Sequence, residues 1–253
     1  MTIVDSIIMG AVEGITEFLP VSSTAHLILT AKILGLKETE ALKAYETIIQ
    51  FGAILAVLFI YKERLTKSFS LWVKLGVAFV PTGVAGLFLY SYIKDLFTPS
   101  ATIWFMIGAG IVFILVERVH KEREDDIEDI NKTSYLRSFL VGCFQTIALL
   151  PGISRSGATI IGGMLLGMKR TAAVEFSFLL AIPTMFVATS YEIYKGYDSM
   201  VIDSLITLSV GFVTSFIFSY FAVKWFLDFI SKYDFTPFGI YLIVSGVGFY
   251  FIL

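Results

Sequence analysis

Long apolar runs separated by short polar segments dominate this chain. Several runs approach the twenty or so residues that an α-helix needs to cross the hydrocarbon core of a bilayer. Charged side chains gather between the runs rather than within them. The pattern predicts six transmembrane helices, at 44–62, 71–93, 100–118, 171–194, 202–227 and 237–253.

Two further apolar segments, 2–35 and 136–168, are each interrupted midway by proline and serine, at Pro20 and at Pro151. Each half is then too short to span a bilayer. Each segment is therefore expected to form a re-entrant hairpin, two short helices that enter and leave the membrane on the same face. A non-helical tip is tolerated at this depth only when it is buried in protein or lines a wet cavity.

The two hairpins resemble each other in sequence, and each is followed by a basic link, an Ala-x-Glu triplet and three spans. This shared order indicates an internal duplication. It predicts a first repeat over 1–118, a linker over 119–135 and a second repeat over 136–253. The alignment pairs Gly10 with Gly142, Glu13 with Gln145, Ser22 with Ser154 and Lys37 with Lys169.

Three spans separate the hairpins, so the hairpins are expected to enter from opposite faces. This is the inverted-repeat plan of many secondary transporters, in which sites lie at the repeat interface. The fold class expected is therefore an all-α integral membrane protein with six transmembrane helices and two re-entrant hairpins in an inverted-topology repeat. Lysine and arginine accumulate on the cytoplasmic side. Alternating spans leave only a minority of them on the other side, namely Lys32, Lys37, Lys43, Lys94 and Lys195.

Composition agrees with a membrane protein. The chain of 253 residues is 57% hydrophobic and 16% charged, whereas a soluble domain carries about a quarter charged residues. The net charge of −2 gives no sign of nucleic-acid binding. Cys143 is the only cysteine, which excludes an intrachain disulfide and argues against a thiolate metal site. The acidic stretch 122–132 is interpreted as a solvated cytoplasmic linker.

The first hairpin carries two carboxylates, Glu13 and Glu17, one helical turn apart. Two such groups persist side by side where water is scarce only if a cation or a shared proton separates them. Pro20 ends this helix, and hydroxyls follow at Ser22, Ser23 and Thr24. His26 lies three residues after Ser23, on the same helical face.

The second hairpin supplies hydrogen-bond donors. Arg155 lies between Ser154 and Ser156 at the start of a helix, where free N–H groups and the positive end of the helix dipole attract anions. The donors suit a phosphate better than a single carboxylate. Insertion scales give a cost of about 2.5–3.5 kcal/mol for a charged residue at the centre of a membrane helix, so Glu13, Glu17 and Arg155 are expected to be functional.

Other polar residues have plainer interpretations. A single hydroxyl in a membrane helix usually bonds back to the turn before it, and a single intramembrane histidine is more often a packing residue than a catalyst. Glu46 and Glu175 stand near the starts of spans and fit an interfacial role as well as a functional one.

The motifs EGITEFLPVSSTAH and PGISRSGAT together closely resemble the signature pair of the bacterial undecaprenyl pyrophosphate phosphatases, the BacA family of bacitracin resistance. The resemblance runs from about residue 6 to the end and includes EFSFLLAIPTM at 175–185. It implies hydrolysis of undecaprenyl pyrophosphate to the monophosphate carrier used in peptidoglycan synthesis. It also implies a divalent cation (Mg²⁺ or Ca²⁺), residence in the bacterial inner membrane and a site open mainly to the periplasm.

The same resemblance assigns roles to residues of both hairpins. The catalytic set implied is Glu13, Glu17, Ser23, His26 and Arg155, with Glu17 and Glu13 holding the metal. The implied partners of the phosphate or hydroxyl groups are Ser22, Thr24, Ser154, Ser156 and Thr159.

Several alternatives stay open at this stage. The nucleophile is Ser23, a water activated by His26, or His26 itself. The lipid tail is expected in an apolar groove between spans. A transporter or flippase of an anion or of undecaprenyl phosphate is the competing function, a lipid receptor without turnover is a third, and a homodimer is possible. The groove is predicted to be kept open by Gly83, Gly86, Gly108 and Gly110.

Overall fold

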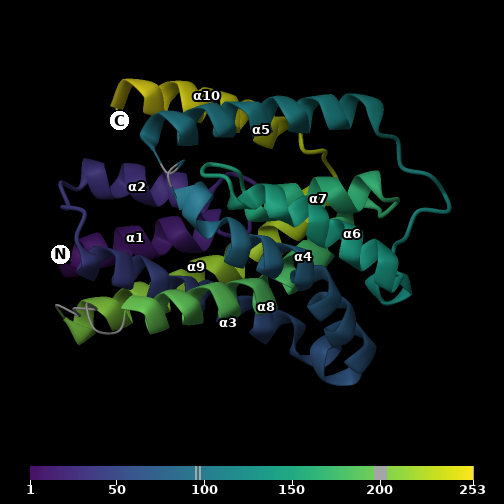
Figure 1. Cartoon of the computed structure of the whole chain (residues 1–253), viewed down its shortest axis with the longest axis horizontal. Coiled ribbons are helices and arrows are strands. Elements are labelled where there is room, and N and C mark those ends of the chain that lie inside the picture. Colours follow the sequence, from purple (N-terminus) through teal and green to yellow (C-terminus); the bar gives the residue numbers. More distant parts are fainter. Residues whose placement is uncertain (95, 97, 197–203, 253) are drawn as a thin grey trace.

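The structure is a computed structural model that describes residues 1–94, 96, 98–196 and 204–252. Figure 1 shows long helices running side by side along the longest axis. The described residues form helices and one isolated β-bridge, between Ile127 and Met168. The α-helices are α1 (Ile3–Thr16), α2 (Ser23–Ile33), α3 (Glu40–Lys67), α4 (Phe69–Lys94), α5 (Pro99–Val119), α6 (Tyr135–Gln145), α7 (Arg155–Leu165), α8 (Arg170–Gly196), α9 (Leu205–Ile230) and α10 (Thr236–Ile252), and the 3₁₀ turns are η1 (Ile130–Lys132) and η2 (Thr146–Leu149).

Five of the predicted spans correspond to helices that are long and apolar enough to cross a membrane, within the described residues: α3, α4, α5, α8 and α9. The sixth, 237–253, corresponds to α10, which has 17 residues and is therefore shorter than a typical span. At 1.5 Å per residue α10 is about 26 Å long. Residues 202, 203 and 253 of the predicted spans lie outside the described residues.

Both predicted hairpins form, and their helices begin at related capping residues. Thr2 caps α1 in a reciprocal capping box with Asp5, and Ser134 caps α6. In the second helix of each hairpin the capping positions are Ser22 for α2 and Ser154 for α7. An N-cap oxygen satisfies a backbone N–H that the helix cannot. The side chains of Thr2, Ser134 and Ser154 do this, whereas Ser22 occupies the N-cap position of α2 without a capping hydrogen bond from its side chain.

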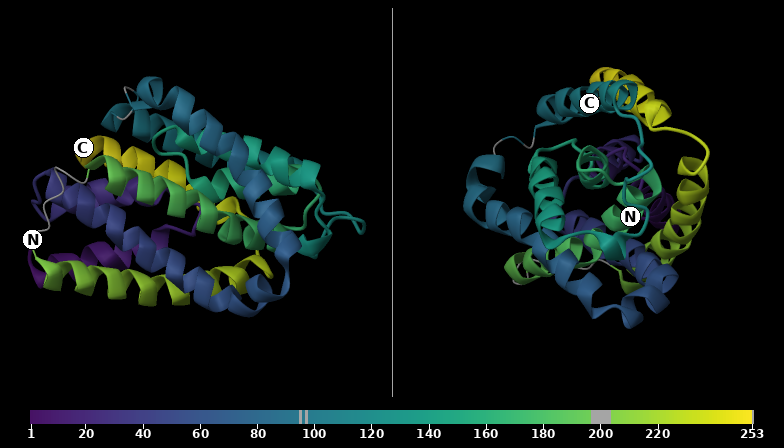
Figure 2. Two further views of the ribbon diagram at one scale, coloured as in Figure 1. Left: turned by 60° about the horizontal axis from the view of Figure 1, so that its bottom comes forward. Right: turned by 90° about the vertical axis from the view of Figure 1, so that its right-hand side faces the viewer.

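The packing of the helices has the exchange symmetry of an internal repeat. Helix α1 of the first hairpin packs on α9 of the second half, and α6 of the second hairpin packs on α4 of the first half. The equivalent helices α3 and α8 contact each other, as do α5 and α10. Figure 2 shows α5 and α10 together as an outer layer over the hairpins. The fold class is thus the one predicted, while the residue bounds of the two repeats stay a prediction.

Glycines at equivalent positions allow the two exchange-related contacts. A Cβ atom at Gly10 would lie 2.5 Å from the carbonyl oxygen of Gly211 in α9, and one at Gly142 would lie 1.9 Å from that of Ala78 in α4. Both distances are shorter than any side chain permits. Each hairpin therefore needs a glycine where its first helix meets the opposite half.

The four glycines predicted to line a lipid groove differ in their surroundings. A Cβ at Gly108 would point into open space, and one at Gly86 would only touch Leu149 at 4.0 Å. By contrast, a Cβ at Gly110 would lie 2.6 Å from the carbonyl oxygen of Gly239 in α10, and Gly83 lies against a phenylalanine ring of its own helix. The prediction is therefore wrong for Gly110, whose role is close helix packing.

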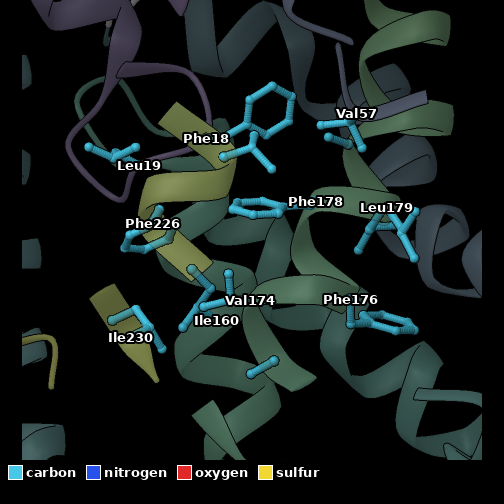
Figure 3. Packing of buried hydrophobic residues seen from close by; sticks show 14 of the residues in the cluster. Phe18, Leu19, Val57, Ile160, Val174, Phe176, Phe178, Leu179, Phe226 and Ile230 are labelled. Atoms are coloured by element: carbon cyan, nitrogen blue, oxygen red, sulfur yellow. The ribbon is translucent and has the colours of Figure 1, made fainter. Parts of the chain in front are cut away.

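An aromatic and aliphatic core surrounds the hairpin tips (Figure 3). Phe18, from the break in the first hairpin, is fully buried and packs edge-on against Phe178 of α8, with 5.4 Å between ring centroids. Phe178 in turn contacts Phe226 of α9. Because these rings come from both halves of the chain, burial of the core fixes the tips of the hairpins relative to the long helices.

Part of the linker packs against the long helices, whereas the sequence predicted a solvated segment. Its beginning is exposed, but Ile130 is completely buried, and Asp129 accepts a hydrogen bond of 2.7 Å from Arg64 of α3. The Arg64 guanidinium also pairs with Glu175 of α8. The second half of 122–132 is therefore docked onto the ends of the long helices.

Candidate active site

The tips of the two hairpins touch each other at the centre of the molecule. The hydroxyls of Ser154 and Ser156 donate to the carbonyl oxygen of Leu19, at 3.5 and 3.0 Å. The two hydroxyls lie 2.8 Å apart. All three residues are buried, so the broken backbone at the first tip is capped by side chains from the second.

Arg155 projects from the second tip into the first. Its Nη2 donates to Oε1 of Glu17 at 2.9 Å, and its Nη1 donates to the carbonyl oxygen of Ser177 in α8 at the same distance. The guanidinium also lies over the Phe18 ring, 5.6 Å from its centroid. These contacts explain how an arginine side chain only 14% exposed is accommodated, because a buried charge is tolerated when it is paired and hydrogen-bonded.

Two groups beside this ion pair have unused hydrogen-bonding capacity. Glu13 is fully buried, and neither of its carboxylate oxygens has a hydrogen-bond partner among the described residues. The Nε of Arg155 is also buried, and it too lacks a partner within the same part of the chain. A buried carboxylate without a partner is costly, so the arrangement suits a bound cation or proton at Glu13 and an anion at Arg155.

The second repeat provides an internal comparison for Glu13. Its equivalent, Gln145, is also fully buried, but its amide donates to Thr82 at 2.9 Å and to Thr184 at 3.2 Å. The same position is therefore a satisfied neutral contact in one half and, as far as the described residues go, an unpaired acid in the other. The two positions share their burial and differ in chemistry.

Ser23, at the start of α2, extends the polar cluster of the first hairpin. Its hydroxyl donates to Oε2 of Glu17 at 2.7 Å, while Oε1 of the same carboxylate receives Arg155. The single carboxylate of Glu17 thus connects the hydroxyl of one hairpin to the guanidinium of the other.

His26 is one turn further along α2 and faces α10. Its Nδ1 lies 2.8 Å from the carbonyl oxygen of Ser22, and its Nε2 lies 2.6 Å from the hydroxyl of Tyr241. The Ser22 backbone is left-handed, with φ 68°, a conformation that is costly for a residue with a Cβ. His26, expected to share a helical face with Ser23, thus has polar contacts with Ser22 and Tyr241.

The remaining predicted residues occupy different environments. Thr159 bonds back to the first turn of α7, to the carbonyls of Arg155 and Ser156, and to the Ser177 hydroxyl at 2.5 Å. Thr24 is exposed at the start of α2. Glu46 is half-buried on α3, whereas Glu175 pairs with Arg64 at the linker end of the molecule.

The residues that contact the site but were not selected from the sequence include Phe18, Ser177 and Tyr241. Phe18 follows Glu17 within the first motif, and Ser177 lies in the stretch 175–185 that follows the second motif. Both could therefore have been selected from their place in the sequence. Tyr241 lies in an ordinary apolar run, 215 positions from His26, and nothing in the sequence distinguishes it.

The side chains of the site can be compared with those that usually bind a divalent cation. Within the described residues, no group of three or more His, Cys, Asp or Glu side chains is arranged to hold a metal ion. Mg²⁺, however, usually binds proteins through one or two carboxylates and completes its shell with water and phosphate oxygens. Glu13 and Glu17 fit that requirement, because they offer two neighbouring carboxylates and the buried oxygens of Glu13 have no partner among the described residues.

A comparison with known proteins identifies the family. The family model described as bacitracin resistance protein BacA matches residues 6–248. The chain belongs to the BacA family. Curated relatives named undecaprenyl-diphosphatase include proteins of Persephonella marina, 56% identical over 97% of both chains, and of Wolinella succinogenes, 51% identical over 100% of this chain and 99% of the relative. A Campylobacter jejuni protein of the same name is 48% identical over 98% of this chain and 93% of its own.

As a BacA family member, the chain is a multi-pass membrane protein, in agreement with its apolar helices. The BacA match covers both hairpins and each of the described α-helices, in part or in full.

Proposed function

We propose that this chain is an undecaprenyl-diphosphatase, which hydrolyses undecaprenyl pyrophosphate to undecaprenyl phosphate and inorganic phosphate. Full-length relatives about half identical to it carry that name. The returned monophosphate would serve again as the lipid carrier of peptidoglycan synthesis, which accounts for bacitracin resistance.

One structural observation carries this proposal. The two hairpin tips bring Arg155 and Glu17 into a buried ion pair, next to a Glu13 carboxylate for which the described residues offer no partner. A purely structural pair has no need of a second buried acid. A pyrophosphate head-group with its counter-ion supplies both missing partners.

The phosphate is expected to bind at the start of α7. The Nε–H of Arg155 has no hydrogen-bond acceptor among the described residues. The positive end of the α7 dipole points to the same tip. These groups are fixed before the substrate arrives, because Ser177, Phe18 and Glu17 hold the guanidinium. Donors fixed in this way stabilise the charge that develops on the transferred phosphoryl oxygens.

We propose that Glu13 and Glu17 would hold a divalent cation, Mg²⁺ or Ca²⁺. Such a cation would supply charge neutralisation to the phosphate oxygens. It would also pair the buried oxygens of Glu13.

The reaction breaks the P–O bond between the terminal phosphoryl group and the lipid phosphate, which leaves as undecaprenyl phosphate. Three nucleophiles fit the site: the Ser23 hydroxyl, a water, and His26. Attack by Ser23 or His26 gives a phospho-enzyme that water then hydrolyses, whereas direct attack by water gives inorganic phosphate in one step. Ser23 lies nearest to the Arg155–Glu17 pair, through its hydrogen bond to Glu17. Acid quenching during turnover, followed by mapping of the labelled residue, distinguishes the three routes.

We propose that the protein resides in the bacterial inner membrane with the site open mainly to the periplasm. The end of the molecule that carries the linker also carries most of the lysines and arginines, and the two termini lie at the other end (Figure 1). By the positive-inside rule, this distribution supports a cytoplasmic linker.

The proposal is tested with purified protein in detergent, undecaprenyl pyrophosphate and Mg²⁺. Phosphate release is expected, and it should stop with a chelator and resume with Mg²⁺ or Ca²⁺. Arg155→Lys keeps the charge but loses the planar fork of donors, so kcat/KM should fall about 10²-fold.

Arg64→Lys is the matched control, since Arg64 also bridges two acidic residues but lies at the linker end. It should keep kcat/KM within about twofold of wild type, as expected for a substitution away from the site. An inert wild-type protein refutes the activity. Equal activity in Arg155→Lys and wild type refutes the site.

A further inference from the structure

The contact between His26 and Tyr241 restricts what His26 can do. A carbonyl oxygen can only accept a hydrogen bond, so Nδ1 of His26, 2.8 Å from the Ser22 carbonyl, carries the proton. In the neutral ring the single lone pair is then on Nε2. That lone pair accepts the Tyr241 hydroxyl at 2.6 Å.

Any role of His26 as base or nucleophile needs this lone pair. With Nδ1 committed to the backbone, Nε2 is the nitrogen that would take a proton or attack phosphorus. In the structure it is already used by Tyr241. The reacting state must therefore differ from this one by the loss of the His26–Tyr241 hydrogen bond.

The surroundings of Tyr241 suit a contact that breaks. The tyrosine is 44% exposed, on the outer layer formed by α5 and α10. Its ring is nearly parallel to that of His26, at an angle of 9°, and Phe249 of the same helix meets the imidazole edge-on at 5.5 Å. Helix α10 is itself held by α5, through close contacts such as Gly110 against Gly239. The imidazole thus lies where α10 contacts the first hairpin.

We propose that Tyr241 is a gating residue for the phosphatase proposed above: its hydroxyl masks Nε2 of His26 until a diphosphate head-group enters beside α10 and displaces it. The Ser22 carbonyl keeps the tautomer while this happens, so the released nitrogen is ready to act. Tyr241 then limits access to the base without taking part in the chemistry.

The test uses Tyr241→Phe, which keeps the ring and removes the donor. Substrate binding no longer has to break a hydrogen bond, whose net value of about 0.5–1.5 kcal/mol corresponds to a rise in kcat/KM of about twofold to tenfold. Tyr250→Phe is the matched control, because Tyr250 is an exposed tyrosine of the same helix. It should leave kcat/KM unchanged.

A second measurement needs no activity. The chain has two histidines, so His120→Gln leaves His26 as the only imidazole. Its ¹⁵N spectrum should show a proton on Nδ1, and the Nε2 resonance should move toward that of a free acceptor when Tyr241→Phe is added. Thermal unfolding checks that both variants are folded.

The outcomes separate this inference from the proposed function. If wild type releases no phosphate, the phosphatase proposal fails and the spectra alone decide the contact. An Nε2 resonance that is identical with and without the Tyr241 hydroxyl refutes the contact. A fall in kcat/KM, or no change, in a folded Tyr241→Phe protein refutes the gating role.

Discussion

At the scale of single residues, the distribution of unpaired buried groups separates structural from functional positions. Gln145 and Glu13 occupy equivalent places, but only the glutamine has partners within the described part of the chain. The glutamine contributes to stability, since breaking a buried hydrogen-bond set leaves polar atoms unsatisfied. The acid costs stability when no ligand is bound, which is the expected property of a site residue.

The pair Glu13→Gln and Gln145→Leu tests this distinction. Glu13→Gln should lower phosphate release about 10²-fold or more, because it removes a cation ligand. It should leave the melting temperature unchanged or higher, because an unpaired buried charge is lost. Initial rates and thermal unfolding in detergent give both quantities.

Gln145→Leu should behave in the opposite way. It leaves the hydroxyls of Thr82 and Thr184 without their amide partner, at a cost of about 1–3 kcal/mol in stability. Activity per folded molecule should stay within about twofold of wild type. Equal loss of activity in both variants would contradict the division of roles between the repeats.

At the scale of helices, small residues decide which elements can meet. Gly142 lies where α6 crosses α4, and a side chain there would meet backbone rather than a flexible group. The hairpin helices are short, of 14 and 11 residues for α1 and α2, so they depend on such crossings for their position. The site lies at their tips and moves with them.

Gly142→Ala should therefore destabilise the protein by about 1–3 kcal/mol or more, since overpacking against backbone forces the helices apart. It should also lower activity, because the second hairpin carries Arg155. Gly108→Ala is the control, with open space around the added methyl group. It should leave stability unchanged or raise it by about 0.5–1 kcal/mol, since alanine is the better helix former. Thermal unfolding measures both variants. Equal melting temperatures for Gly142→Ala and Gly108→Ala would contradict this account.

At the scale of the whole molecule, the linker joins the two halves at one end while the hairpin tips join them at the centre. Asp129 connects η1 to α3 through Arg64, and Lys169 pairs with Glu128 just before α8. The pKa of Asp129 is lowered mainly by the backbone N–H of Asn131, with a further contribution from Arg64. The Lys169 ammonium likewise lowers the pKa of Glu128.

Docking of the linker should therefore weaken in acid. A carboxyl whose pKa is lower in the folded state stabilises the fold above its unfolded value, 3.8 for aspartate. That contribution is lost as the pH falls through the folded pKa. The melting temperature of wild type should be steady near neutral pH and fall below about pH 4.

Asp129→Asn should reduce this acid dependence of the melting temperature, because the residue no longer titrates. Asp125→Asn, at an exposed position of the same linker, should retain the wild-type profile. Superimposable profiles for wild type and Asp129→Asn would show that the docked carboxylate does not contribute to stability.

The sequence by itself determined the spans, the two broken hairpins and the charged and hydroxyl residues at the hairpin tips. These depend on local properties: the length of apolar runs, proline and serine at the breaks, and the cost of charges such as Arg155 at membrane depth. The docked part of the linker, expected to be solvated, shows where local rules were insufficient.

Only the tertiary structure decided which groups are partners. Glu17 and Arg155 are 138 positions apart, and His26 and Tyr241 are 215 apart. No periodicity links such residues, because their distance depends on how two halves of opposite orientation pack together. The same packing gave Gln145 two partners and Glu13 none among the described residues, although the sequence aligned them as equivalents.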